Sequence, residues 1–131
     1  MRDIHHRNTR NIVPLGIRIA VSDLEQSHRW YKEVLGLHME MADDGQSSVH
    51  EIELPDGAKE PVFWLVPETM PGTPDPGVSL VCHVGQLGKI VTDLRDAGVT
   101  IDSEPTLRPG TAVPSAIILD PDGHRIVLIG D

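Results

Sequence analysis

Hydrophobic and polar positions follow a pattern in this chain that occurs twice, about sixty residues apart. In each copy the pattern predicts an apolar strand, a short polar break and an amphipathic helix that ends at glycine. Three more strands are predicted after the helix. The first strand and helix are predicted at 15–21 and 22–36, and their counterparts at 78–84 and 86–97. A repeat of this length indicates two fused copies of one strand–helix–three-strand unit.

The other strands are short and are bounded by turn residues. We predict them at 38–41, 48–54, 62–66, 100–102, 115–119 and 125–129. Pro-Asp-Gly turns occupy equivalent places at 55–57 and 121–123, and Asp120 and Asp122 at the second turn are expected to cap the turn backbone rather than to act as a catalytic carboxylate pair. His124, which follows the second turn, is expected to be exposed to solvent. The proline-rich stretch 105–114 predicts a long loop, of the kind that often covers a site.

These elements predict a simple domain organisation. Residues 1–14, which include His5 and His6, are polar and irregular and form an N-terminal arm. Residues 67–77 are rich in proline and glycine and form a linker. A single domain spans 15–131, with module one at about 15–66 and module two at about 78–131.

Charge and composition narrow the range of partners. The net charge of −9 argues against nucleic acid, because phosphate binding needs a basic face. The chain has no apolar run long enough to span a membrane and no leader segment. Its single cysteine, Cys82, excludes an internal disulfide and is typical of a reducing compartment. We therefore predict a cytoplasmic protein that binds neither nucleic acid nor membrane.

Three segments carry a resemblance to a known family. They are Ile19-Ala20-Val21-Ser22-Asp23-Leu24, Trp30-Tyr31-Lys32-Glu33-Val34-Leu35-Gly36-Leu37 and Leu119-Asp120-Pro121-Asp122-Gly123-His124. With these segments the chain resembles the vicinal oxygen chelate superfamily, which includes glyoxalase I, bleomycin and fosfomycin resistance proteins and extradiol dioxygenases. The resemblance implies an α+β fold, in which two tandem βαβββ modules form a cup-shaped cleft of mixed β-sheet with the helices outside. It also implies a small-molecule ligand and a homodimer that completes the cleft.

The resemblance further implies positions for a metal ion. Metal-using relatives place His, Glu or Gln at four strand positions. In this chain those positions hold Gly16, Trp64, Ser79 and Val127. None of the four is a normal metal ligand, so we predict that the family metal site is lost and that the protein has no cofactor. A relocated site built from His50, Glu51 and His83 stays open as an alternative, although strand alternation puts His50 and Glu51 on opposite faces.

Alternation along the strands predicts which side chains line the cup. One face of each module's first strand is apolar and should pack beneath the helices, so the opposite face should point into the cup. The predicted ligand-binding residues are Gly16, Arg18, Ala20, Trp64, Ser79, Val81, His83, Arg125 and Val127. Cys82 should face the helix layer as a buried thiol rather than a nucleophile. Trp30 and Tyr31 should belong to the core or to the helix surface rather than to the site.

Arg18 and His83 are the candidate catalytic residues. Arg18 interrupts an apolar strand, where an unpaired charge is costly. It either holds an anionic or carbonyl-bearing ligand or pairs with a carboxylate such as Glu51 or Glu53. His83 is either a general base, since imidazole titrates near neutral pH, or a structural hydrogen-bonding residue. Trp64 either offers a flat surface to a planar ligand or packs in the core.

Two classes of function are compatible with these residues. The first is a metal-free small-molecule-binding protein of the glyoxalase/bleomycin resistance type, which sequesters a ligand in the cup. The second is a lyase, isomerase or dioxygenase-like enzyme that acts next to a carbonyl, either with a relocated metal or with Arg18 stabilising an oxyanion while His83 moves a proton. The missing metal ligands favour the first class.

Overall fold

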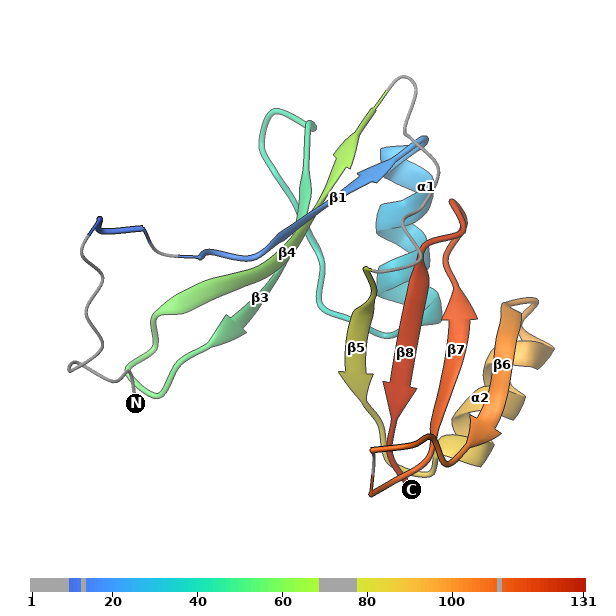
Figure 1. Cartoon of the computed structure of the whole chain (residues 1–131). Helices are drawn as coiled ribbons and strands as arrows, with labels where there is room; N and C mark the ends of the chain where they lie inside the picture. The colour runs from blue at the N-terminus through green and yellow to red at the C-terminus, as the bar shows by residue number, and fades with distance from the viewer. Residues whose placement is uncertain (1–9, 13, 69–77, 111) are drawn as a thin grey trace.

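The computed structural model describes residues 10–12, 14–68, 78–110 and 112–131, which form two similar modules (Figure 1). The elements of the first module are β1 (Ile17–Val21), α1 (Leu24–Arg29), the π-helix η1 (Trp30–Val34), β2 (Glu40–Met41), β3 (Ser48–Glu53) and β4 (Lys59–Pro67). Those of the second module are β5 (Leu80–His83), α2 (Leu87–Asp96), β6 (Thr100–Thr106), β7 (Ser115–Leu119) and β8 (Arg125–Ile129).

Each module contributes one four-stranded mixed sheet. The first sheet has the strand order β1-β4-β3-β2, and the second has the order β5-β8-β7-β6. In each sheet the first strand runs parallel to its neighbour, and the remaining pairs are antiparallel. The predicted α+β fold of two tandem βαβββ modules is therefore confirmed.

Local chemistry sets the start of α1 and the glycine ends of both helical segments, and the glycine ends are those that the sequence predicts. The Asp23 carboxylate accepts a hydrogen bond from the Gln26 backbone N–H at 3.0 Å, which caps the first turn of α1. The helical segments are followed by Gly36 and Gly98, with φ angles of +74° and +89°. These left-handed conformations suit glycine, because a Cβ atom would strain them.

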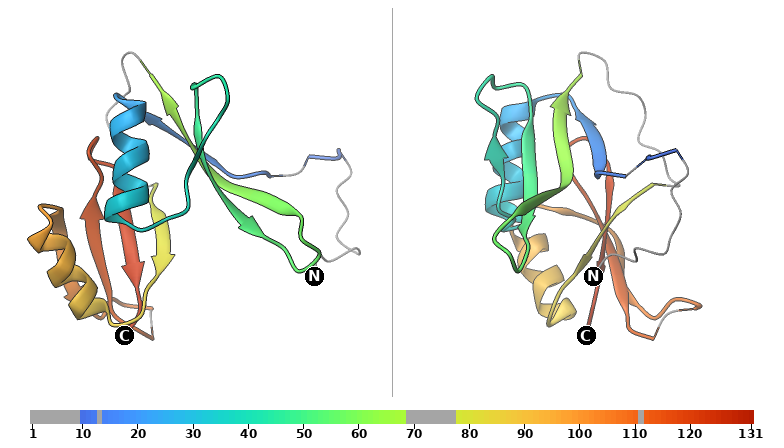
Figure 2. Two further views of the ribbon diagram at one scale, coloured as in Figure 1. Left: turned by 180° about the vertical axis from the view of Figure 1, so that it is seen from behind. Right: turned by 90° about the vertical axis from the view of Figure 1, so that its left-hand side faces the viewer.

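The helices of both modules lie on one side of the molecule, as the view from behind shows (Figure 2). Their apolar faces and the sheet faces beneath them form one continuous core. Its fully buried members include Val21, Tyr31, Phe63, Leu65, Leu87, Val91, Ala116, Ile118 and Ile126. In Figure 1, α1 lies beside the second sheet, whereas the far end of the β3–β4 hairpin extends away from that sheet.

A buried carboxylate joins the two modules. Asp120 is only 5% exposed, and its Oδ2 atom accepts a hydrogen bond from the Tyr31 hydroxyl at 2.7 Å. Its Oδ1 atom accepts the backbone N–H groups of Asp122 and His124 at 2.9 and 2.8 Å. Burial, together with the Asp120 carboxylate, raises the pKa of Tyr31. Of the two predicted placements, core and helix surface, Tyr31 takes the core, and its hydroxyl also holds the second module in place.

The turn after β7 makes two further contacts with the first module. The Asp122 carboxylate accepts the Ser22 backbone N–H at 3.2 Å, and His124 Nε2 donates to the Ala20 carbonyl oxygen at 2.8 Å. The prediction that His124 is exposed is wrong, because this hydrogen bond holds the side chain in a half-buried position. The Pro-Asp-Gly turn thus connects the modules in addition to reversing the chain.

Some element boundaries differ from the sequence prediction. β6 continues to Thr106 through Pro105, which an edge strand tolerates because its outer N–H groups have no strand partner. β4 begins at Lys59, three residues before the predicted strand. Of the predicted arm and linker, residues 1–9, 13 and 69–77 lie outside the described residues, and so do His5 and His6. No described helix is long and apolar enough to cross a membrane.

Candidate ligand-binding site

The first sheet has a face that points away from α1, and we call it the cup face. Arg18 pairs in register with Trp64, and Ala20 pairs with Val66, so these side chains share that face. The opposite face carries Val21, Phe63 and Leu65, which are 0 to 1% exposed and pack in the core. The structure therefore places Arg18, Ala20 and Trp64 on the predicted face.

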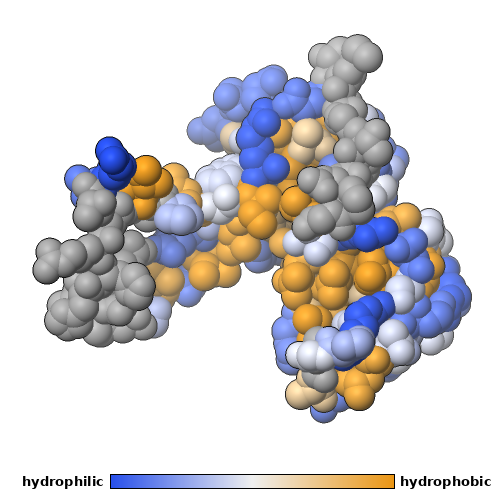
Figure 3. All heavy atoms as spheres, in the orientation of Figure 1, coloured by the Kyte–Doolittle hydropathy of each residue, from blue (hydrophilic) through white to orange (hydrophobic). Residues whose placement is uncertain are grey.

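The second sheet has an equivalent cup face. Val81 pairs with Val127, and His83 pairs with Ile129. Ser79 and Arg125 lie on the same side, two residues before Val81 and Val127. Hydrophobic side chains gather on the side of the second sheet that faces the viewer, opposite α2 (Figure 3). This cup face is apolar at its centre, and polar side chains lie towards its ends.

Cys82 lies on the other face of the second sheet, as predicted, but it is half-buried rather than buried. It lines a cavity of about 350 Å³ together with Ile90 and Leu94 of α2, Val34 and Leu35. Burial raises the pKa of the Cys82 thiol, so the neutral thiol is favoured over the thiolate. The cavity lies on the helix side of the sheet, where the thiol is an apolar packing group.

Gly16 and Trp64, which occupy two of the four family ligand positions, contact each other. A Cβ atom built on Gly16 would lie 2.7 Å from the Val62 carbonyl oxygen and 2.9 Å from Cζ3 of the Trp64 indole. The space beside the Gly16 backbone, where a ligand side chain would project, is therefore filled by the indole and by β4. This pair does not fit a metal ion.

The second module repeats this arrangement with different side chains. Val81 pairs with Val127 as Arg18 pairs with Trp64, and Ser79 precedes Val81 by two residues as Gly16 precedes Arg18. The pairing therefore relates the four positions by the internal repeat. Valine has no donor atom, and serine is a poor ligand, so this pair does not fit a metal ion either.

The relocated metal site is not assembled by the structure. His50 Nδ1 donates to the His38 carbonyl oxygen at 2.8 Å, and its ring packs on Phe63. Both side chains lie on the helix-facing side of the first sheet. His83 lies in the other sheet, on its cup face. Across the described ranges, no three His, Cys, Asp or Glu side chains gather closely enough to hold a metal ion.

Arg18 pairs with a carboxylate, but not with one of those expected. Its Nη2 atom lies 2.7 Å from Oε1 of Glu68, rather than against Glu51 or Glu53, and the arginine side chain is 64% exposed. The carboxylate follows β4 directly, so it lies beside the end of β1. Within the described residues, neither the 350 Å³ cavity beside His83 nor the smaller cavity at the module junction includes Arg18. Neither of these two cavities, as the described residues line them, therefore contains both Arg18 and His83.

The junction between the modules contains a smaller cavity. Ser79, Arg125, His124 and Ile17 are among its lining residues, and its volume is about 40 Å³. Ligand sites usually measure roughly 300 to 1,000 Å³, so this cavity has room for ordered water but not for an organic ligand. Among the described residues that line it, this part of the junction therefore encloses no space large enough for an organic ligand.

Arg108 is a cup-face residue that the sequence analysis missed. It lies in the loop after β6, and its guanidinium donates to the side chains of Ser103 and Ser115. The sequence predicts that the proline-rich loop around it could cover a site, but no pattern distinguishes this arginine from other surface arginines. Its position depends on two serines whose roles only the fold shows.

Comparisons with known proteins agree with this architecture. The model of the Glyoxalase/Bleomycin resistance protein/Dioxygenase superfamily matches residues 12–128. The chain belongs to this superfamily. No curated protein sequence matches the chain.

Several solved structures share the superfamily fold with this protein. A hypothetical protein, SA1046 from S. aureus, is 20% identical, with a TM-score of 0.68 and coverage of 92% of this chain and 95% of the other. A glyoxalase/dioxygenase from Nostoc punctiforme is 23% identical, with a TM-score of 0.65 and coverage of 92% of each chain. A superfamily member from Sphaerobacter thermophilus is 22% identical, with a TM-score of 0.65 and coverage of 92% and 98%. At these identities the similarity shows a common fold and does not identify a ligand.

Proposed function

We propose that this superfamily member binds a small organic ligand on the cup faces of its sheets without a metal ion. The contact between Gly16 and Trp64 carries the proposal, because the indole takes the space beside the first family ligand position. Val127, at the equivalent place in the second module, continues an apolar surface with Val81, which is 57% exposed. An exposed apolar surface with a few polar groups at its ends suits an organic ligand.

The geometry gives less support to an enzyme that uses Arg18 and His83. The Arg18 guanidinium is held by Glu68, which neutralises the charge that would stabilise an oxyanion. His83 lies on the second sheet, and its neighbours in register are Ile129 and, beyond it, Ser115. Binding without chemistry is therefore the function that these residues support best.

Ligand binding is tested with neutral probes on a cup-face variant. We expect benzamide, 2-naphthamide or hexanamide to shift amide resonances of β5 and β8 in ¹H–¹⁵N spectra of the wild type. Val81→Trp adds an indole to the cup face and should weaken binding of the same amide by about tenfold. Thr92→Trp, at an exposed position on α2, is the matched control and should leave binding unchanged.

Metal content is measured on the same tag-free protein. After incubation with zinc, nickel, ferrous iron and manganese in turn and removal of the excess, elemental analysis should find less than one metal per chain. Stoichiometric retention of one metal would contradict the metal-free site. Failure of every amide to perturb the cup-face resonances would contradict the binding function itself.

We further propose that the protein functions as a homodimer in which a second copy covers the open cup faces. The cavity between the modules of one chain holds about 40 Å³, and β1 and β5 are edge strands of their sheets. On β5 the side chain of Val81, which lies on the cup face, is 57% exposed. Sedimentation should show a species of twice the chain mass of 14.3 kDa, because these strands otherwise leave apolar surface in water. A monomer at micromolar concentration would contradict this assembly.

A further inference from the structure

The second sheet has a cavity on its helix side, opposite the cup face, and we call it the helix-side cavity. Its volume is about 350 Å³, and residues of both modules line it. The first module contributes the end of η1 and the segment after it, and the second contributes parts of β5, α2 and β8. The lining residues include Leu35, Leu37, Cys82, Val84, Ile90 and Leu94. The two helical segments that border this cavity lie on the same side of the molecule (Figure 2).

The volume of the helix-side cavity is sufficient for an organic molecule. Ligand sites usually measure roughly 300 to 1,000 Å³. An engineered protein cavity of about 150 Å³, lined by leucine, isoleucine and phenylalanine, stays dry and binds benzene. The helix-side cavity, at about 350 Å³, has more than twice that volume and therefore has room for two fused aromatic rings.

The inner part of this cavity, as the described residues line it, is apolar. Leu94 is 7% exposed, and Cys82 contributes a neutral thiol because burial raises its pKa. Asp93 and His83 also line the cavity, but both are exposed, and the Asp93 carboxylate accepts a hydrogen bond from the Lys89 ammonium at 3.0 Å. A charged ligand group in the interior would lose its hydration and gain no ionic partner, so the lining favours a neutral molecule.

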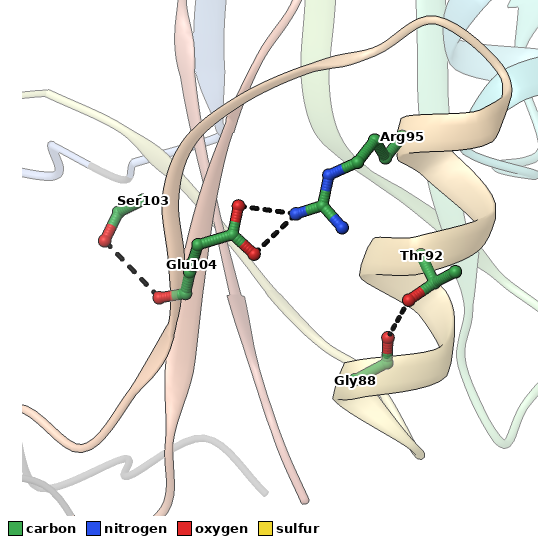
Figure 4. Close-up of polar contacts among 5 residues, drawn as sticks. All are labelled: Gly88, Thr92, Arg95, Ser103 and Glu104. Atoms are coloured by element: carbon green, nitrogen blue, oxygen red, sulfur yellow. Dashed lines mark hydrogen bonds and ion pairs between the residues drawn. The ribbon is translucent and has the colours of Figure 1, made fainter.

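The walls of the helix-side cavity are anchored in the core. Leu87 and Val91, which are each 1% exposed, fix α2 against the second sheet, and Arg95 of α2 also pairs with Glu104 of β6 at 2.5 Å (Figure 4). On the other side, η1 is fixed by Tyr31, which is fully buried. Closing the cavity would therefore disturb the core packing, whereas an apolar molecule inside it would supply the missing contacts.

We propose that the helix-side cavity is a second ligand site, which binds a neutral apolar molecule about the size of two fused aromatic rings. This site lies on the opposite face of the second sheet from the cup, so it goes beyond the proposed function, and either site can exist without the other. Its ligand contacts Leu35 of the first module and Ile90 of the second, and the polarisable sulfur of Cys82 suits the edge of an aromatic ring. Binding therefore stabilises the association of the modules.

The site is tested with 2-naphthol and with two ions of similar size, 2-naphthoate and 2-naphthylmethylammonium. We expect calorimetry to show 2-naphthol bound at least about tenfold more tightly than either ion, because the interior offers a charge no partner. Iodoacetamide alkylation of Cys82, the single cysteine, should slow about fivefold when free 2-naphthol is at about four times its dissociation constant, since only the unoccupied protein reacts. The ligand should also raise the urea concentration at which the protein unfolds.

Two variants fill the helix-side cavity from its opposite walls. Ile90→Phe adds volume from α2, and Leu35→Phe adds volume from the first module, so the test does not depend on the folding of a single variant. Each should weaken binding of 2-naphthol at least about tenfold, because the added ring takes the space of the ligand. Thr92→Phe is the matched control on α2. Thr92 is exposed and donates to the Gly88 carbonyl oxygen at 3.0 Å (Figure 4), and this variant should leave binding unchanged.

Several results would overturn the helix-side site without touching the test of amides at the cup face. One is failure of 2-naphthol to bind, and another is binding that leaves the alkylation rate of Cys82 unchanged. Loss of 2-naphthol affinity in Val81→Trp, with Ile90→Phe and Leu35→Phe unaffected, would place this molecule on the cup face instead. An alkylation rate that falls with protein concentration but not with 2-naphthol would show that a second copy of the chain covers the cavity.

Discussion

Replacing Asp120 with alanine should destabilise the protein by about 3 to 5 kcal/mol, because it removes the acceptor of three hydrogen bonds in a buried position. The Tyr31 hydroxyl, which is fully buried, would lose its partner, and so would the backbone N–H groups of Asp122 and His124. Urea unfolding monitored by circular dichroism measures the change in the free energy of unfolding. Tyr31→Phe removes one of the three bonds and should cost about 1.5 to 3 kcal/mol.

A double-mutant cycle separates the Tyr31–Asp120 bond from the rest of the network. Since the two side chains contact each other directly, their effects should be non-additive by about 1 to 3 kcal/mol. Asp56→Ala is the matched control, because Asp56 occupies the equivalent turn of the first module and its carboxylate accepts the local Ala58 N–H at 2.9 Å. That variant should cost less than about 1 kcal/mol. Equal losses from Asp120→Ala and Asp56→Ala would show that the inter-module bond contributes little.

The faces of the sheets follow from the sequence because side chains alternate strictly along a strand. A one-residue error would have exchanged the two faces, yet Val81, His83 and Val127 lie on the predicted side and Cys82 lies on the other. The helix ends can also be predicted from the sequence, since Asp23, Gly36 and Gly98 act through local backbone geometry. Local rules therefore account for the fold and for the set of cup-face positions on the strands.

The inter-module network could not be derived in the same way. Turn capping explains an aspartate at position 120 without any distant partner, and Tyr31 lies 89 residues earlier in the chain. The sequence does contain one indication, because the first module has Leu54 at the position equivalent to Asp120. A carboxylate that replaces an apolar residue in an internal repeat indicates a contact that the other copy lacks.

The hydrogen-bond and ion-pair partners of the two arginines near the cup could not be predicted for a similar reason. Arg18 pairs with Glu68, which lies directly after β4, whereas the sequence suggests Glu51 or Glu53 on β3. Arg108 reaches the cup face from a loop, where alternation gives no direction for a side chain. Pairings of this kind depend on the register between β1 and β4 and on the path of the loop after β6. The alternation of side chains along a strand gives no information about either.

Gly130→Ala should destabilise the protein by about 3 kcal/mol, because the added methyl group has no space. A Cβ atom at Gly130 would lie 1.8 Å from the Val84 carbonyl oxygen and 2.9 Å from the carbonyl carbon. The ends of β5 and β8 would have to separate, which weakens the hydrogen bond from Val84 N–H to the Ile129 carbonyl oxygen at 2.8 Å. Both atoms belong to backbone, so no side-chain rotation can relieve the contact.

The control is an alanine at a glycine that has space. Gly88 lies in α2, and a methyl group added there would meet no neighbouring element within 4 Å. Gly88→Ala should therefore stabilise the protein by roughly 0.5 to 1 kcal/mol through the better helix propensity of alanine. If the free energy of unfolding falls for Gly130→Ala and rises for Gly88→Ala, the close approach of the Val84 backbone causes the loss of stability. The loss of a glycine in general does not. If Gly130→Ala unfolds at the same urea concentration as the wild type, the end of β8 can move aside, and the contact with Val84 then does not fix the spacing of β5 and β8.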